Sequence, residues 1–103
     1  MLGVAYKRDI DDVRESFALD IILLLERKGA LITYSDPYVP NIQLDHLQLS
    51  SADSLTMAET ADCVVVVTDH AKFDYPGILE RAKLIVDTRN AFQSASSDKI
   101  VRL

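Results

Sequence analysis

Four stretches of the chain are almost wholly apolar and show no alternation of polar and apolar residues. They are residues 1–5 (MLGVA), 31–34 (LITY), 63–67 (CVVVV) and 83–87 (KLIVD). Continuous apolar runs of this length are typical of strands that are covered on both faces, as in a parallel sheet. The pattern therefore predicts four buried strands.

Helical periodicity separates these stretches. Between residues 17 and 28 apolar side chains recur on one face at helical spacing. Ser16 is suited to cap the start of this helix, and Gly29 supplies the residue that ends a helix in a left-handed conformation. Shorter helical patterns at 54–60 and 75–82 precede and follow the third apolar stretch.

The alternation of strands and helices predicts an α/β fold with a parallel sheet and right-handed crossovers. Residues 36–50 hold two prolines and no sustained period, which predicts a loop with a short edge strand near 47–49. The tail, residues 91–103, has a serine-rich turn followed by a candidate last strand.

Composition narrows the class of protein. The chain has 103 residues, about one domain's length, and is 49% apolar. A net charge of −5 argues against a surface that binds nucleic acid or anionic lipid. One cysteine allows no internal disulfide, which favours a reducing cytoplasmic setting, and no apolar run approaches the ~18–20 residues of a membrane span. The first strand-like run begins at Met1 without a signal peptide, so we expect a fragment of a longer protein.

Charged residues follow all four predicted strands, at the edge where open α/β sheets bind their ligands. Lys7 follows the first strand and Arg89 follows the fourth. If both strands lie in one parallel sheet, the two cations share an edge and can clamp a phosphate or diphosphate. The alternative is that each cation pairs with a nearby acid, Asp9 or Asp87, and the spacing does not decide between the two.

A self-contained dinucleotide site is disfavoured. A Rossmann phosphate turn requires several glycines, but only Gly3 is present, and the turn after the first strand is bulky and charged. Asp36 ends the second strand, where an acid could hold a ribose. Without the glycine turn, Asp36 is better explained as a turn residue that precedes a proline.

Other candidate sites have weaker support. Cys63 heads an apolar strand, which favours a core thiol over a nucleophile. His46 and His70 lack the spacing of metal ligands, so no metal site is predicted, and His70 is expected to be a solvated loop residue that could touch a ligand. A phospho-receiver site is disfavoured because Lys83 opens its strand instead of ending it.

Four segments together resemble a known family. AYKRDIDDVRES, FALDIILLLERKGALITYSDPYVP, ADCVVVVTDH and KLIVDTRNAF, spanning Leu2 to about Phe92, resemble the carboxyl-terminal domain of the UDP-glucose/GDP-mannose dehydrogenase family. Within it, VAYK, YSDPYVP and TDH look closest to the UDP-N-acetylglucosamine and UDP-N-acetylmannosamine 6-dehydrogenases.

The resemblance implies a three-layer, Rossmann-like domain with helices on both faces of a parallel sheet, formed by residues 1–103 as a single UDP-sugar-binding unit. Full-length members bind NAD in an amino-terminal domain, dimerise or form higher assemblies through a central helix, and oxidise the C6 alcohol of a UDP-sugar to a carboxylate. Their products supply surface polysaccharide synthesis, and we expect the protein to be cytoplasmic. The catalytic cysteine lies in the central region, so this chain would hold no catalytic residue and would be inactive alone.

The resemblance also assigns binding residues. Tyr6 and Lys7 match substrate contacts of the first loop, and Arg89 matches the arginine that reaches the nucleotide sugar. Arg14 matches an arginine that contacts NAD across the domain cleft. Phe17 replaces a proline that many relatives have, which should alter only the entry to the helix. The rival interpretation is a non-catalytic interaction or regulatory domain that has lost its ligand.

Overall fold

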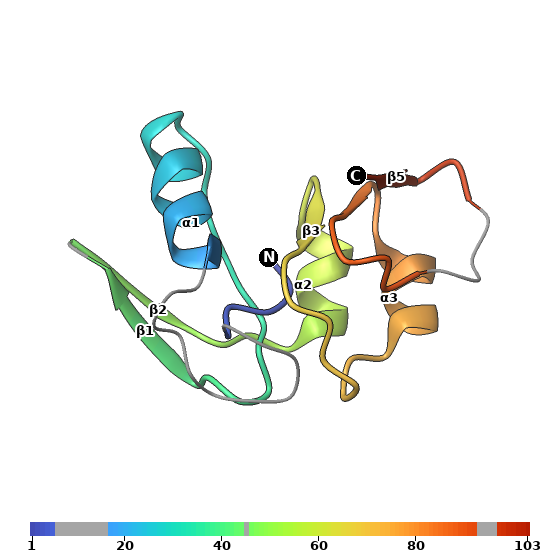
Figure 1. The fold of residues 1–103 in the computed structure, drawn as a ribbon, viewed down its shortest axis with the longest axis horizontal. Helices are drawn as coiled ribbons and strands as arrows, with labels where there is room; N and C mark the ends of the chain where they lie inside the picture. Colours follow the sequence, from blue (N-terminus) through green and yellow to red (C-terminus); the bar gives the residue numbers. More distant parts are fainter. Residues whose placement is uncertain (6–16, 45, 93–96) are drawn as a thin grey trace.

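A computed structural model of the chain describes residues 1–5, 17–44, 46–92 and 97–103 (Figure 1). Its regular elements, in chain order, are α1 (Phe17–Arg27), β1 (Asn41–Leu44), β2 (Leu47–Ser50), α2 (Ser54–Thr60), β3 (Val64–Val66), α3 (Tyr75–Arg81), β4 (Ile85–Asp87) and β5 (Ile100–Arg102).

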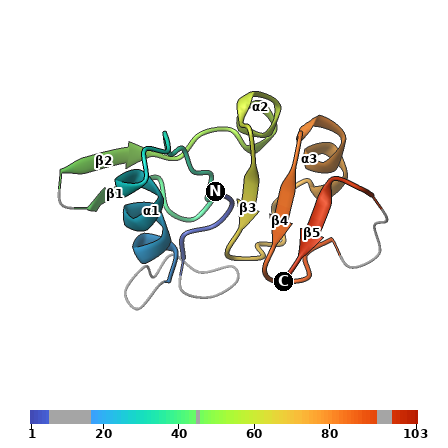
Figure 2. The same cartoon turned by 90° about the horizontal axis from the view of Figure 1, so that it is seen from above.

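The three strands β3, β4 and β5 form a parallel sheet in that order, side by side in Figure 2. Val65, Val86 and Val101 stand opposite one another in the register of this sheet. The candidate last strand in the tail is therefore confirmed as β5.

The amino-terminal segment extends the sheet beyond β3. Leu2 forms parallel bridges with both Ser35 and Val66, and its N–H donates to the carbonyl of Val65 over 2.8 Å. The spatial order is thus the Ser35 segment, the Leu2 segment, β3, β4 and β5. The Ser35 segment, which is second in the sequence, lies on one side of the Leu2 segment, and β3, β4 and β5 follow on the other side. The direction of strand order therefore reverses between Leu2 and β3, which makes this position a topological switch point.

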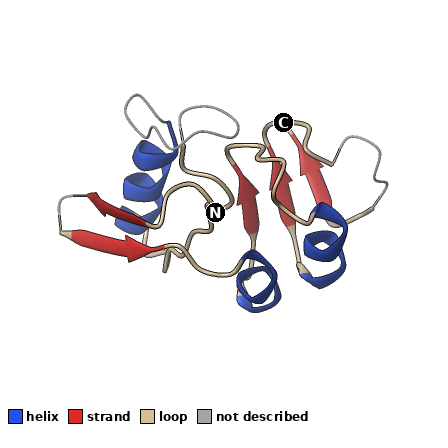
Figure 3. Cartoon of the chain, turned by 90° about the horizontal axis from the view of Figure 1, so that it is seen from below, coloured by secondary structure: helices blue, strands red, loops and turns tan. Residues whose placement is uncertain are grey.

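Alternate residues of the sheet face two separate hydrophobic cores. Val64 and Val66 pack with α2 and α3 on one face, in the cluster of Leu2, Met57, Ala58, Phe73, Ile78, Ala82, Ile85 and Phe92. Val65 and Val67 pack on the opposite face with α1, in the cluster of Met1, Val4, Ala5, Ala18, Ile22, Tyr34, Val39 and Ile42. Figures 1 and 3 show α2 and α3 beside the parallel strands, with α1 next to the β1–β2 hairpin. This confirms the predicted α/β sheet with helices on both faces.

The helix ends follow from local sequence. Gly29 has φ +91°, its N–H donates to the carbonyl of Glu26, and the N–H of Ala30 donates to that of Leu25, which is the Schellman pattern. Asp53 and Asp74 cap α2 and α3 by accepting backbone N–H groups three residues on. The sequence therefore located all three helices to within one residue.

Two predicted strands are not regular strands. In residues 1–5 only Leu2 forms β-bridges, one to Ser35 and one to Val66, and residues 31–34 form none, since the bridge lies just beyond them at Ser35. Gly3 has φ +82°, which interrupts extended backbone, and Leu31 is 99% exposed instead of buried.

The stretch predicted as a loop, residues 36–50, contains an antiparallel hairpin. Strand β1 pairs with β2 from Asn41↔Ser50 to Leu44↔Leu47, so the expected edge strand near 47–49 is confirmed but its partner was missed. Ile42 is buried while Asn41 and Gln43 are exposed, a period-two pattern too short to stand out beside the prolines. Among the described residues no helix is long and apolar enough to cross a membrane.

Candidate functional site

Arg89 follows β4 and reaches back to the neighbouring strand. Its Nε atom donates to the backbone carbonyl of Val67, just beyond β3, over 2.8 Å. Thr88 makes a parallel contact, its hydroxyl donating to the carbonyl of Val66 over 2.6 Å. These contacts place the guanidinium at the carboxyl end of β3, beside the topological switch point where open α/β sheets bind ligands.

Asp87 organises the loop that carries Arg89. Its side chain is fully buried, and one carboxylate oxygen accepts the N–H groups of Arg89 and Ala91 at 3.1 and 3.0 Å. The other oxygen accepts the N–H of Phe92 at 2.9 Å. Within the described residues no ion pair joins the Asp87 carboxylate to the Arg89 guanidinium. The Asp87 carboxylate therefore holds the main chain of the loop and does not pair with the Arg89 guanidinium.

A second buried carboxylate, Asp36, joins three segments at the same edge. Its Oδ2 atom accepts the N–H groups of Val4 and Ala5, at 2.8 and 3.1 Å, and lies 2.9 Å from Nε2 of His70. Its Oδ1 atom accepts the N–H of Tyr38 over 2.8 Å, so Asp36 is the turn residue that the sequence predicted. The carboxylate fixes the point at which the chain leaves the first segment.

His70 corrects an expectation. It is fully buried against Asp36, not solvated in a loop. Asp36 ends the second sheet segment and His70 follows β3, so their contact depends on two segments coming to one edge. A single His in a polar loop sequence does not indicate that it will be buried against a distant carboxylate.

Aromatic rings continue from this pair along the edge. Successive ring centroids from Tyr38 through His70, Phe73 and Tyr75 to Phe92 lie 4.9, 5.6, 5.9 and 5.1 Å apart. Contacts of this geometry add to apolar burial. The chain of rings links the loop after the second segment to the loop that carries Arg89.

The switch point itself is tightly filled. A Cβ atom on Gly3 would lie 2.5 Å from the carbonyl oxygen of Thr68 and 2.6 Å from its Cβ. The Thr68 hydroxyl donates to the carbonyl of Ala5 over 2.7 Å. Gly3 is therefore needed for close contact between the first segment and the end of β3, and the space above it is occupied by protein.

Tyr34, at the end of the second segment, is fully buried, and its hydroxyl donates to the carbonyl of Val39 over 2.8 Å. Burial, with a smaller effect from the charge of Asp36, raises the pKa of Tyr34 to about 12. Tyr34 is therefore a neutral structural group, and it is not a candidate acid or base near neutral pH.

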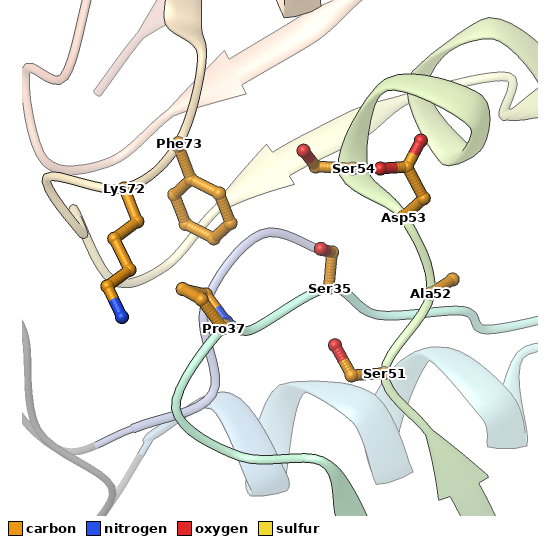
Figure 4. A pocket seen from close by; sticks show the side chains of 8 residues that line it. All are labelled: Ser35, Pro37, Ser51, Ala52, Asp53, Ser54, Lys72 and Phe73. Carbon is orange, nitrogen blue, oxygen red and sulfur yellow. The ribbon is translucent and has the colours of Figure 1, made fainter.

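A hollow of about 230 Å³ lies on the α2 side of the same edge (Figure 4). Lys72 at its mouth holds its Nζ atom 4.6 Å from the centre of the Tyr38 ring. The hollow is smaller than the ~300–1,000 Å³ of typical ligand pockets, so it does not enclose a nucleotide sugar by itself. Its walls are Ser35, Pro37, Ser51, Ala52, Asp53, Ser54, Lys72 and Phe73.

Nearly the whole chain matches the model of a known protein family. The model of the UDP-glucose/GDP-mannose dehydrogenase family, UDP binding domain, matches residues 1–94. The chain belongs to this family. The resemblance seen in the four sequence segments is thereby confirmed.

Individual dehydrogenases match almost the whole chain. It is 31% identical to a UDP-glucose 6-dehydrogenase of Rickettsia felis, covering 97% of the chain and 24% of that protein. It is 34% identical to a UDP-N-acetyl-D-mannosamine dehydrogenase of Pyrococcus horikoshii, covering 87% of the chain and 21% of that protein. The chain thus spans about a quarter or less of these relatives' length.

Solved structures of dehydrogenases from the family share the fold. The UDP-N-acetyl-mannosamine dehydrogenase of Staphylococcus aureus superimposes with a TM-score of 0.71 at 29% identity, covering 98% of the chain and 24% of that protein. The dehydrogenase from Pyrococcus horikoshii gives a TM-score of 0.75 at 26% identity, with the same coverage of both chains. The predicted Rossmann-like class is therefore confirmed.

Of the binding residues that the family resemblance assigns, the structure describes only Arg89. Tyr6, Lys7 and Arg14 lie outside the described residues, so the predicted convergence of Lys7 and Arg89 stays a prediction. Ala5, the last described residue before them, donates its N–H to the Asp36 carboxylate.

Cys63 also corrects an expectation. It lies one residue before β3 and is exposed, so it is not the core thiol that its apolar neighbours suggested. Although the residue is exposed, neighbouring protein partly desolvates the Cys63 thiol and raises its pKa, with a smaller opposing effect from the Met1 amino group. A raised thiol pKa does not favour a nucleophile.

NAD, the cofactor implied for this family of dehydrogenases, does not fit the described residues as a self-contained site. A dinucleotide turn uses glycines so that the pyrophosphate can approach the backbone. Here the glycine of the first segment, Gly3, is packed directly against Thr68. The described part of the chain therefore supplies no phosphate turn for NAD.

Proposed function

We propose that this chain is the nucleotide-sugar-binding module of an NAD-dependent UDP-sugar 6-dehydrogenase. In this proposal Tyr6, Lys7 and Arg89 bind the UDP-sugar, and Arg14 faces NAD that is held mainly by another domain. The domain comprises residues 1–103 and supplies no catalytic residue. Membership of the UDP-binding-domain family supports this function.

The observation that carries the proposal is the placement of Arg89. The guanidinium lies at the carboxyl end of β3, beside the switch point, and its charge is not paired with Asp87. Arginine binds phosphate with two parallel hydrogen bonds, which suits the diphosphate of a UDP-sugar. The chain has a net charge of −5, so a cation at this edge is a local site for an anion on a protein that is acidic as a whole.

The proposal extends to the parent enzyme. This enzyme is cytoplasmic, oxidises the sugar's C6 alcohol to a carboxylate with NAD, acts as a homodimer or higher assembly, and supplies surface polysaccharide synthesis. The names of the relatives, a UDP-glucose 6-dehydrogenase and UDP-N-acetyl-D-mannosamine dehydrogenases, support the chemistry. The chain alone would bind UDP and catalyse no oxidation.

Titration of UDP against the 15N-labelled chain tests the proposal. A few charge-assisted contacts of about 1.5–3 kcal/mol each, open to water, predict a Kd of about 1 mM. Arg89→Ala should weaken UDP binding about tenfold or more, and Lys7→Ala should act in the same direction. Arg27→Ala is the matched control, because it removes one exposed guanidinium from the far end of α1.

The rival function, an interaction domain without a ligand, predicts a different result. No chemical-shift change at several millimolar UDP would support it. Binding that is equally insensitive to Arg89→Ala and Arg27→Ala would also overturn the assignment of Arg89.

A further inference from the structure

We propose that Asp87 is a positioning residue that acts through Arg89, fixing the guanidinium at the switch point before any ligand arrives. This inference rests on the proposed function, in which Arg89 binds the diphosphate of a UDP-sugar. It adds Asp87, which does not touch the ligand but affects how strongly Arg89 binds it.

Hydrogen bonds to Asp87 hold the loop that follows β4. The fully buried Asp87 carboxylate accepts three backbone N–H groups, those of Arg89, Ala91 and Phe92. Asn90 has φ +58°, a left-handed conformation that Asn tolerates better than most residues. That turn brings the later N–H groups back towards the same carboxylate. One side chain therefore holds three residues of the segment that follows β4.

The loop that carries Arg89 is also attached to β3. The Thr88 hydroxyl donates to the carbonyl of Val66, and Nε of Arg89 donates to that of Val67. The two acceptors are consecutive residues at the end of β3. The loop is therefore held both by the Asp87 carboxylate and by the backbone of the neighbouring strand. The Arg89 side chain is thus fixed at its backbone and at Nε.

The contacts described above do not use the Nη atoms of the Arg89 guanidinium. Nε is occupied by Val67, and across the described ranges the Nη atoms of Arg89 make no hydrogen bond or ion pair. The Nη atoms carry the donors that can bind a phosphate. Because the side chain is already ordered, binding loses less rotamer entropy than it would with a free arginine.

Both oxygens of the Asp87 side chain act as acceptors. A carboxylate is an acceptor at both oxygens and can accept all three N–H groups. In Asp87→Asn one oxygen becomes an NH2 donor that faces a backbone N–H, so at least one of the three bonds is lost. The shape of the side chain is kept, which makes this substitution the sharpest probe.

A double-mutant cycle on the full chain tests the inference, with UDP as the probe and Kd as the measurement. Asp87→Asn should weaken UDP binding about five- to tenfold, and it should have less than about a twofold effect when Arg89→Ala is already present. Asp74→Asn is the matched control, because Asp74 caps α3 by accepting the N–H of Gly77. It should change the Kd by less than about twofold.

The outcomes separate the two proposals. If Arg89→Ala binds UDP as the unmodified chain does, the proposed function of Arg89 fails and this inference falls with it. If Arg89→Ala weakens binding but Asp87→Asn does not, or if the two effects multiply independently, only the positioning role is overturned.

A measurement on the unmodified chain covers the case in which Asp87→Asn does not fold. The Nε–H of Arg89, bonded to the Val67 carbonyl, should exchange with water about tenfold or more slowly than the Nε–H of the exposed Arg27, in the absence of UDP. Equal exchange rates for the two side chains would show that Arg89 is not held in advance and would overturn the inference.

Discussion

Nε2 of His70 lies 2.9 Å from Oδ2 of Asp36, and both side chains are sealed from solvent. The pair joins the loop after β3 to the end of the second segment. Through the N–H groups of Val4 and Ala5, which share the same Oδ2 atom, it also fixes the end of the first segment. The ends of two bridged segments and the loop after β3 thus meet at one carboxylate, next to the switch point.

Loss of the His70 ring should destabilise the chain strongly. His70→Ala removes one partner of a buried pair and the ring between Tyr38 and Phe73, so the free energy of unfolding should fall by about 3 kcal/mol or more. The matched control is His46→Ala, which removes an exposed histidine paired with Glu26 and should cost about 0.5 kcal/mol or less. Urea denaturation followed by circular dichroism measures both, and similar losses in the two variants would contradict the structural role of the pair.

The two left-handed glycines should differ sharply in tolerance to alanine. At Gly3 a methyl group meets Thr68 at 2.5 Å in addition to the unfavourable φ, so Gly3→Ala should lower the free energy of unfolding by about 3–5 kcal/mol. At Gly29 nothing lies within 4 Å of the added carbon, and only the left-handed φ remains, at about 1–2 kcal/mol. Thermal melts of the two variants check the order, and a smaller loss at Gly3 would show that the switch point can open.

The stability of the 103-residue polypeptide with a free amino group should depend on pH between 6 and 8. Burial lowers the pKa of the Met1 amino group to about 6 from its ordinary 8, against a smaller opposing effect of Cys63. Across this window the unfolded chain holds the proton more firmly than the folded chain, so the free energy of unfolding rises with pH. The full gain is about 3 kcal/mol, reached near pH 8 and absent below pH 6.

Acetylation of Met1 provides the control for this pH effect. The acetylated chain keeps an N–H for the carbonyl of Thr33, which the free amine also contacts at 2.8 Å, but it has no charge to remove. The difference in unfolding free energy between the free and acetylated chains should therefore shrink from pH 6 to pH 8. A difference that stays constant over this range would refute the lowered pKa.

Removal of the Tyr34 hydroxyl tests the buried hydrogen bond at the end of the second segment. Tyr34→Phe leaves the carbonyl of Val39 without this donor and should cost about 1–2 kcal/mol in unfolding free energy. Because the pKa of Tyr34 is about 12, the substitution should not change the tyrosinate absorbance of the folded chain below pH 11. An absorbance titration of both chains checks this, and a difference near pH 10 would mean that the hydroxyl is solvated.

The helices were predictable because their signals are local. Gly29 ends α1 in the left-handed conformation that the sequence indicated, and the apolar period between residues 17 and 28 matches its buried face. Strands β3 and β4 were predictable from runs of β-branched residues that suit burial on both faces.

The parts that could not be predicted depend on contacts between distant segments. His70 and Asp36 are 34 residues apart, and only the switch in strand order brings them together. Cys63 shares the apolar character of the run that follows it, but the strand begins one residue later and leaves the thiol exposed. Arg89 was recognisable from its place after the fourth predicted strand, whereas the role of Asp87 could be seen only from its three N–H contacts in the structure.

The close packing of Gly3 against Thr68 has a consequence for how such a domain can evolve. In sheets that bind phosphate through a glycine turn, recognition is built from the main chain, which substitutions leave largely unchanged. Here Gly3 is packed against Thr68, so the described part of the first segment offers no such turn, and Arg89 would meet an anion with its side chain. Ligand choice can then change by single replacements on the surface while the folded framework stays intact.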